Sequence, residues 1–237
     1  MKKVFKVSSV IFEIEYHYKL TDVIFEPYAY QGSEEVNEFI SVTEEDKLYE
    51  LSLADTTEPA IIEVSCILRK YAEICLEKYS ALVFHASAVK YNGGAYLFTA
   101  VSGTGKSTHT TLLKELLGDK LEYINDDKPT IKFNSNGEII VYGNPWCGKH
   151  MRGNNISAPL KGIIKLERAS DNSVLEISEL EMLPILFEQS YKPKDAKLSE
   201  TLLDYFTKLL KGVKLYKLSC NKDISAAECS FKNILSK

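Results

Sequence analysis

The stretch Ala100-Val-Ser-Gly-Thr-Gly-Lys-Ser107 combines glycines, hydroxyl groups and one lysine at the spacing of a phosphate-binding loop. Backbone N–H groups of such a loop surround phosphate oxygens, and Gly103 and Gly105 let the backbone come close because they have no Cβ. Lys106 is placed to reach the β- and γ-phosphates, and the Ser107 hydroxyl to bind Mg²⁺. The residues expected to bind the nucleotide are Ser102, Gly103, Thr104, Gly105, Lys106, Ser107 and Thr108.

Position 100 departs from the usual pattern, because Ala100 stands in place of the first glycine. Alanine is the smallest residue with a Cβ, and at the end of a strand it does not have to adopt a positive φ. The alternative is an ordinary glycine-rich turn that exposes a lysine. A strand over 95–100, the loop, the Lys-Ser pair and a following helix all agree with a phosphate site, so we expect that site.

Two aspartates, Asp126 and Asp127, end the next predicted strand. Carboxylates beside a phosphate loop lie close to its metal ion, so one of them can coordinate Mg²⁺, directly or through water. The other can accept a proton from an incoming hydroxyl group. Neighbouring residues on an extended backbone point in different directions, so the pair can divide these roles, and the division stays open. The alternative is a polar turn before Lys128-Pro129.

The order of His85-Ala-Ser-Ala-Val, the glycine-rich loop and Asn-Asp-Asp resembles the HPr kinase/phosphorylase C-terminal domain, over roughly residues 80 to 170. The wider group includes ATP-dependent phosphoenolpyruvate carboxykinase. The resemblance implies a kinase that uses ATP and Mg²⁺ to phosphorylate a hydroxyl group. It also implies that His85 lies near the phosphates and that Asp126 and Asp127 handle the metal and the proton. With the loop residues, the expected catalytic residues are Asp126, Asp127, His85 and Lys106, and the expected metal ligands are Ser107, Asp126 and Asp127.

The chain also departs from that family. Ser107 is followed by Thr108, where HPr kinases typically have glutamate, and the residues after the aspartates do not match. We therefore expect a divergent branch with another acceptor, a serine of a peptide or small protein. The alternatives are an ATP-binding regulatory protein without phosphotransfer, and a small-molecule kinase related to the carboxykinases. HPr kinases form homo-oligomers, so a second copy of the chain is a further candidate partner.

A second glycine-containing segment, 143–155, holds the chain's only tryptophan. Lys149 and Arg152 could neutralise the transferring phosphoryl group or hold an acidic acceptor, and Trp146 could shape the substrate pocket. The alternative is a surface loop that Trp146 anchors in the core. Arg168 follows a predicted strand and could touch the nucleotide, although only its position suggests this.

Composition narrows the possible partners. The 237 residues carry 29 basic and 33 acidic side chains, a net charge of −4, which does not favour nucleic acid as a partner. We predict no membrane partner, because no apolar stretch approaches the length of a membrane span. The five cysteines include no CxxC pair and are odd in number, which favours free thiols in a reducing cytoplasm.

These residues require a scaffold that brings strand ends together, and the patterns predict one α/β domain with a mixed sheet and flanking helices. We expect a β-rich N-terminal extension over 1–57, in which Tyr49, Leu51 and Leu53 alternate as in a strand, and a P-loop kinase-like domain over 58–237. Strands are expected at 81–84, 95–100, 121–125, 129–133, 138–142, 160–166, 172–177 and 213–219. Helices are expected at 57–79, after the loop, and at 179–190, 196–210 and 223–235.

Overall fold

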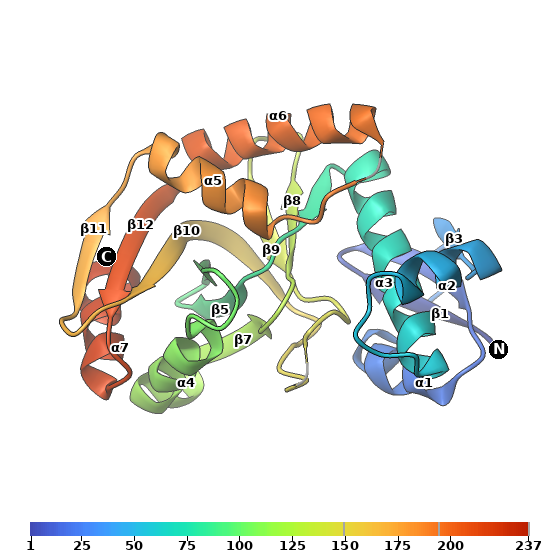
Figure 1. The fold of residues 1–237 in the computed structure, drawn as a ribbon, viewed down its shortest axis with the longest axis horizontal. Coiled ribbons are helices and arrows are strands. Elements are labelled where there is room, and N and C mark those ends of the chain that lie inside the picture. The colour runs from blue at the N-terminus through green and yellow to red at the C-terminus, as the bar shows by residue number, and fades with distance from the viewer. Residues whose placement is uncertain (149, 194, 237) are drawn as a thin grey trace.

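The computed structural model describes residues 1–148, 150–193 and 195–236. Within these residues the chain forms a small N-terminal sheet and a large mixed sheet (Figure 1). The mixed α/β class predicted from the sequence is confirmed. No helix in the described ranges is both long and apolar enough to cross a membrane.

The N-terminal sheet is built on a tight hairpin. Strands β1 (Lys2–Val7) and β2 (Val10–Glu15) pair antiparallel, and β3 (Glu38–Ile40) joins β2 in parallel. Short helices α1 (Lys19–Phe25) and η1 (Glu26–Tyr28) connect β2 to β3. The long helix α3 (Pro59–Lys78) covers this sheet, with Val64, Ile67 and Tyr71 in the same buried cluster as Phe12 and Ile14.

The strand expected around Tyr49, Leu51 and Leu53 is wrong, because this region contains helix α2 (Glu44–Leu51). Thr43 and Asp46 form a capping box, in which the Thr43 hydroxyl accepts from the Asp46 N–H at 3.2 Å. Leu51 and Leu53 are exposed, so the alternation corresponded to no buried face. The Thr43–Asp46 capping box is visible in the sequence, and it predicts this helix better than a three-residue alternation predicts a strand.

The large sheet contains the strands that position the loop. Within the described residues its order is β4-β8-β9-β10-β6-β5-β7, with β12 beside β10 and β11 beside β12. The bounds are β4 (Ala81–Val83), β5 (Ser87–Tyr91), β6 (Gly94–Thr99), β7 (Leu121–Asn125), β8 (Thr130–Phe133), β9 (Ile139–Tyr142), β10 (Ser157–Arg168), β11 (Ser173–Glu176) and β12 (Lys214–Cys220). Strand β5 was not predicted, and β10 is longer than expected.

Three strands, β6, β10 and β12, run parallel, so their carboxyl ends meet at one edge of the sheet. Their side chains alternate between two buried clusters: Leu97 and Ile163 face one, and Phe98 and Ile164 face the other. Both faces are covered, as is usual for parallel strands. The result is a rigid platform with apolar cores above and below.

Helices cover the two faces of this platform (Figure 1). α4 (Lys106–Leu117) and α7 (Ile224–Ser230), which a π-helical turn over Phe231–Leu235 continues, pack on one side. α5 (Glu179–Gln189) and α6 (Ala196–Gly212) pack on the other. The helices predicted for these segments are confirmed.

The division into 1–57 and 58–237 stays a prediction. Helix α3 and strand β4 contribute to both neighbouring cores. Ala81 and Val83 belong to the N-terminal cluster, while Leu76 and Leu82 belong to the cluster under α5 and α6. The N-terminal part is thus joined to the large sheet by shared apolar packing.

Candidate functional site

The predicted phosphate loop joins β6 to α4, as the motif requires. Gly103 has φ +77° and Gly105 has φ +128°, and a Cβ at either position would meet open space. Both positions therefore need glycine for backbone conformation rather than for lack of room. Ala100 is buried at the end of the strand. The missing first glycine leaves strand, loop and helix in their expected places.

Lys106 opens α4 and is buried. Its Nζ donates to the Ala100 carbonyl at 3.1 Å. Burial lowers the pKa of Lys106, whereas the nearby charges of Asp127 and Asp126 act in the opposite direction. The lysine and both aspartates therefore lie within electrostatic reach of one another beside the loop.

Arg168, at the end of β10, holds the loop from its outer side. Its Nε donates to the Thr104 carbonyl at 3.0 Å, and its Nη2 donates to the Gly103 carbonyl. A groove of about 510 Å³ runs from the loop across the end of β10 to Ile185 of α5. These two hydrogen bonds turn the loop carbonyls toward Arg168 and stabilise this conformation of the loop.

Asp126 is a carboxylate with one oxygen left open. Its side chain is 1 % exposed, and Oδ1 accepts from the Ser87 hydroxyl at 2.5 Å. Oδ2 has no hydrogen-bond partner among the described residues, and Arg152 Nη1 is 4.0 Å away. Burial raises the pKa of Asp126, while Ser87, Ser107 and Arg152 oppose that rise. A buried acceptor without a donor is suited to a cation or a ligand proton.

Asp127 faces a different set of neighbours. Its Oδ1 lies 3.4 Å from His85 Nε2, and its Oδ2 lies 3.6 Å from Lys128 Nζ. Burial lowers the pKa of His85, and the charges of Lys106 and Lys128 lower it further, against the effect of Asp127. The lowered pKa favours the neutral imidazole, whose single ring N–H can be donated to the carboxylate.

The turn that separates the two aspartates is fixed by asparagines. Asn125 Oδ1 accepts from the N–H groups of Asp127 at 2.9 Å and Lys128 at 2.8 Å. Asn125 Nδ2 donates to the Asn144 carbonyl at 3.0 Å, and Asn144 Nδ2 donates to the Lys128 carbonyl at 2.7 Å. The different directions of the two carboxylates thus follow from a locked side-chain network.

Residues 150–155 fold back onto the end of β7, and Arg152 lies beside the site. The Asp126 N–H donates to the Arg152 carbonyl at 2.8 Å, and Arg152 Nη1 donates to the Thr111 hydroxyl at 2.7 Å. A Cβ on Gly143 would lie 1.9 Å from the Asn154 carbonyl oxygen. The glycine is therefore needed for the close approach of two backbones.

Of the two other predicted substrate residues, the structure describes only Trp146. Trp146 packs partly against the N-terminal core, and Lys128 Nζ lies 4.3 Å from its ring centre. Lys149 lies outside the described residues. Substrate roles for Trp146, Lys149 and Arg152 stay predictions.

The oxygen donors at the site determine whether it fits a metal ion. The described residues contain no group of three or more His, Cys, Asp and Glu side chains that could hold a metal ion by themselves. Mg²⁺ in nucleotide sites needs only one or two carboxylates together with phosphates and water. The open Oδ2 of Asp126 and the neighbouring Ser107 hydroxyl are oxygen donors of this kind. They fit a magnesium ion that arrives with a nucleotide.

Several residues of the site were missed by sequence reasoning. Ser87 belongs to the His85-Ala-Ser-Ala-Val stretch, but its spacing from His85 does not indicate the hydrogen bond that it donates to Asp126. The Gln189 carbonyl, at the end of α5, accepts from the His85 N–H at 2.7 Å. No sequence signal links residues this far apart.

Comparisons with known proteins give little support beyond this geometry. No family model matches the chain, and no curated protein matches it. Solved structures that match include the HPr(Ser) kinase/phosphatase from Coxiella burnetii, with 14% identity, 54% of this chain and 96% of that chain covered, and a TM-score of 0.29. At that TM-score the match indicates at most a distant relation in fold. Function has to be inferred from the site itself.

Proposed function

We propose that this protein is an ATP- and Mg²⁺-dependent kinase that transfers the γ-phosphoryl group to a hydroxyl, with a serine of a peptide or small protein as acceptor. The observation that carries the proposal is the convergence of Lys106, Asp126 and Asp127 beside the phosphate loop, where both carboxylates act on the charge of the lysine. A module that only binds nucleotide needs the loop and the lysine, but no proton acceptor.

The surroundings of the two aspartates suggest how they divide the work. Asp126 is the proposed metal ligand, because its Oδ2 is buried and has no donor among the described residues. Asp127 is the proposed base, because its side chain is partly exposed and lies beside His85, so an acceptor hydroxyl can reach it. His85 would position Asp127 and steady the proton it accepts.

The loop and Lys106 supply the remaining contributions. Amides of residues 102–106 would hold the phosphates, and Lys106 would exchange its contact with the Ala100 carbonyl for a phosphate oxygen. Bound Mg²⁺ would offset the negative charge on the phosphates. Arg152 would add positive charge near Asp126. ATP, rather than another nucleotide, and a cytoplasmic location stay part of the proposal, and the free cysteines fit a reducing compartment.

The decisive experiment offers γ-labelled ATP and Mg²⁺ together with peptides that contain serine or only alanine at the test position. We expect label on the serine peptides with the wild-type protein, and none with Asp126→Asn or Asp127→Asn, while both variants still bind ATP. Asp119→Asn is the matched control, because Asp119 is an exposed aspartate that pairs with Lys114 at 3.4 Å. ATP binding without transfer to any hydroxyl peptide, small protein or small molecule would instead favour an accessory nucleotide-binding protein.

A further inference from the structure

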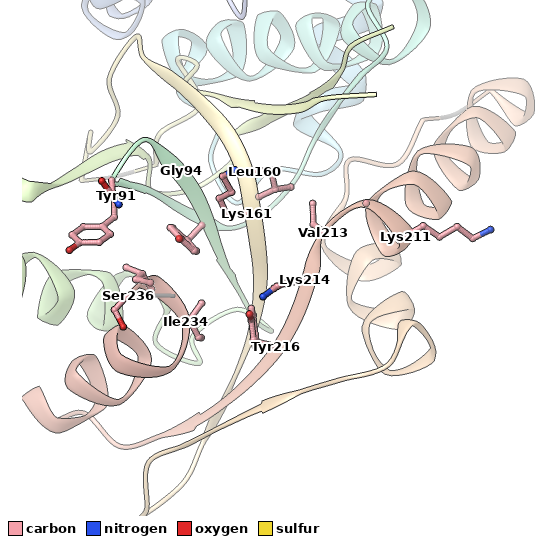
Figure 2. Close-up of a pocket in the computed structure, with 14 residues that line it drawn as sticks. Tyr91, Gly94, Leu160, Lys161, Lys211, Val213, Lys214, Tyr216, Ile234 and Ser236 are labelled. Carbon is pink, nitrogen blue, oxygen red and sulfur yellow. The ribbon is translucent and has the colours of Figure 1, made fainter. Parts of the chain in front are cut away.

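A cavity of about 850 Å³ opens near the amino ends of β6, β10 and β12 (Figure 2). Strand β6 begins at this cavity with Gly94 and ends at Thr99, before the loop. At about 3.3 Å per residue the two places are separated by roughly 16 Å of strand. The cavity is therefore distinct from the proposed active site, and its volume falls in the range typical of small-molecule sites.

Two tyrosines form part of the cavity wall. Tyr96 is 9 % exposed and Tyr216 is 4 % exposed, and both line the cavity. Neither hydroxyl has a hydrogen-bond partner within the described residues, and neither is sealed from the cavity. A largely buried tyrosine normally gives its hydroxyl a partner. These two hydroxyl groups are thus available to something that enters the cavity.

The charged residues of the lining are all basic. Lys161 and Lys214 line the cavity without an ion-pair partner in the part of the chain described, and no lining residue is acidic. Elsewhere on β10, Lys165 pairs with Glu167 at 2.7 Å. Lys211 also lines the cavity, but its side chain extends away from the other labelled residues (Figure 2). Within the described residues no carboxylate pairs with Lys161 or Lys214. Burial and then the charge of Glu176 raise the pKa of the Tyr216 hydroxyl nearby.

Two glycines, Gly94 and Gly162, leave room for side chains that line the cavity. A Cβ on Gly94 would lie 2.6 Å from Lys161 Cγ, and a Cβ on Gly162 would lie 3.3 Å from Tyr216 Cε2. Because both residues lack a Cβ, the stem of Lys161 and the ring of Tyr216 can come this close to the strand backbone. Gly94 and Gly162 thus help to make the space that the lysine and tyrosine border.

We propose that this cavity binds a small organic anion, with its apolar part against the tyrosine rings and its carboxylate or phosphate group at Lys161, Lys214 and the Tyr96 and Tyr216 hydroxyls. Ammonium groups and phenolic hydroxyls are both donors, so together they suit an acceptor-only anionic group. The site does not depend on the phosphate loop, and it stands whether or not the chain is a kinase.

The test uses benzoate and phenyl phosphate as probes, with benzyl alcohol as the neutral counterpart, in an amide NMR titration of the whole protein. We expect saturable shifts at residues 94–96, 160–162 and 212–216 with an anion. Tighter binding of benzoate would indicate a carboxylate site, and tighter binding of phenyl phosphate would indicate a phosphate site. Shifts at 102–106 report any separate binding of phenyl phosphate to the loop.

Variants decide whether the named residues are responsible. Lys161→Gln with Lys214→Gln should weaken anion binding about fivefold or more, since two charge-assisted contacts are lost. Lys197→Gln with Lys208→Gln removes the same charge from exposed positions on α6 and should leave binding unchanged. Tyr96→Phe with Tyr216→Phe, which removes only the two hydroxyls, should weaken binding about twofold. Equal binding of benzyl alcohol, shifts absent from the cavity, or no effect of the Lys161 and Lys214 changes would overturn the proposal.

Discussion

Two buried carboxylates differ in how many of their oxygens accept hydrogen bonds. They are Glu63 in the N-terminal part and Asp126 beside the phosphate loop. Glu63 is 0 % exposed, and it accepts from the N–H groups of His17 at 2.8 Å and Tyr18 at 3.0 Å, where α1 begins. The Thr21 hydroxyl donates to it at 3.3 Å. Both Glu63 oxygens are therefore occupied. Asp126 has a donor for Oδ1 and none for Oδ2 within the described chain.

The difference separates a carboxylate that serves the fold from one that is open to a ligand. Glu63 satisfies the N–H groups of His17 and Tyr18, which lead into α1. Asp126 loses hydration without full replacement, which disfavours its charged form. Leaving Oδ2 of Asp126 without a donor disfavours folding, so we infer that this oxygen serves to bind a metal ion or a ligand.

The largest expected effect is on turnover. Asp127→Asn removes the proposed base and Asp126→Asn the proposed metal ligand, so each should lower phosphotransfer by about 10²-fold or more. Glu63→Gln, which keeps the shape of its side chain, should leave the rate per folded molecule unchanged. Steady-state rates of the three variants at one ATP concentration measure this. Equal losses of rate in all three variants would contradict the claim that Asp126 serves catalysis and Glu63 serves only the fold.

The next effect is on the segment that carries Arg152 to Asp126. Gly143→Ala places a Cβ against two backbone oxygens, of Asn154 at 1.9 Å and Ile124 at 2.6 Å, so the free energy of unfolding should fall by about 3 kcal/mol. In Gly212→Ala the new Cβ meets only the end of the Ile139 side chain, at 3.0 Å, and the loss should be smaller. Urea unfolding compares them, and similar midpoints would contradict the close backbone approach.

A third effect distinguishes the carboxylates by stability. Glu63→Ala leaves several donors at the start of α1 unsatisfied, so unfolding free energy should fall by about 2 kcal/mol. Asp126→Asn should cost little or raise stability at pH 7, because it removes a buried charge that is only partly compensated. Thermal melts of both variants give the comparison. A greater loss for Asp126→Asn than for Glu63→Ala would contradict it.

The smallest effect is the pH dependence of that comparison. Burial raises the pKa of Asp126 above the ordinary value of 3.8, so the unfolded chain releases this proton at lower pH than the folded chain. Stability contributed by this group is therefore lost as pH rises from the unfolded pKa through the folded pKa. The advantage of Asp126→Asn over wild type should grow across that window and vanish below it. An advantage that is constant with pH would speak against a raised pKa.

The sequence predicted what short-range signals specify. The strand over 95–100, the glycine-rich loop and the helix that begins at Lys106 were predicted because their signals are contiguous in the sequence. The helix at 44–51 was not predicted, because the alternation of Tyr49, Leu51 and Leu53 is typical of a strand. Thr43 and Asp46 form the capping box that indicates the helix.

Long-range contacts were beyond sequence reasoning. The donor that Ser87 supplies to Asp126, and the contact of Arg152 with Thr111, join residues from separate elements. They depend on how β5, β7 and α4 pack, which no local pattern encodes. The sequence located both aspartates, but only packing reveals that they differ, with one oxygen of Asp126 left open.

The account depends most on that open oxygen, and the most direct test is the effect of Mg²⁺ on ATP affinity, measured by calorimetry. In the wild-type protein we expect Mg²⁺ to strengthen ATP binding about tenfold, which corresponds to about 1.4 kcal/mol. In Asp126→Asn that gain should disappear, while affinity for metal-free ATP stays the same or rises. An equal gain from Mg²⁺ in both proteins would show that Asp126 does not hold the metal, and would contradict the proposed site.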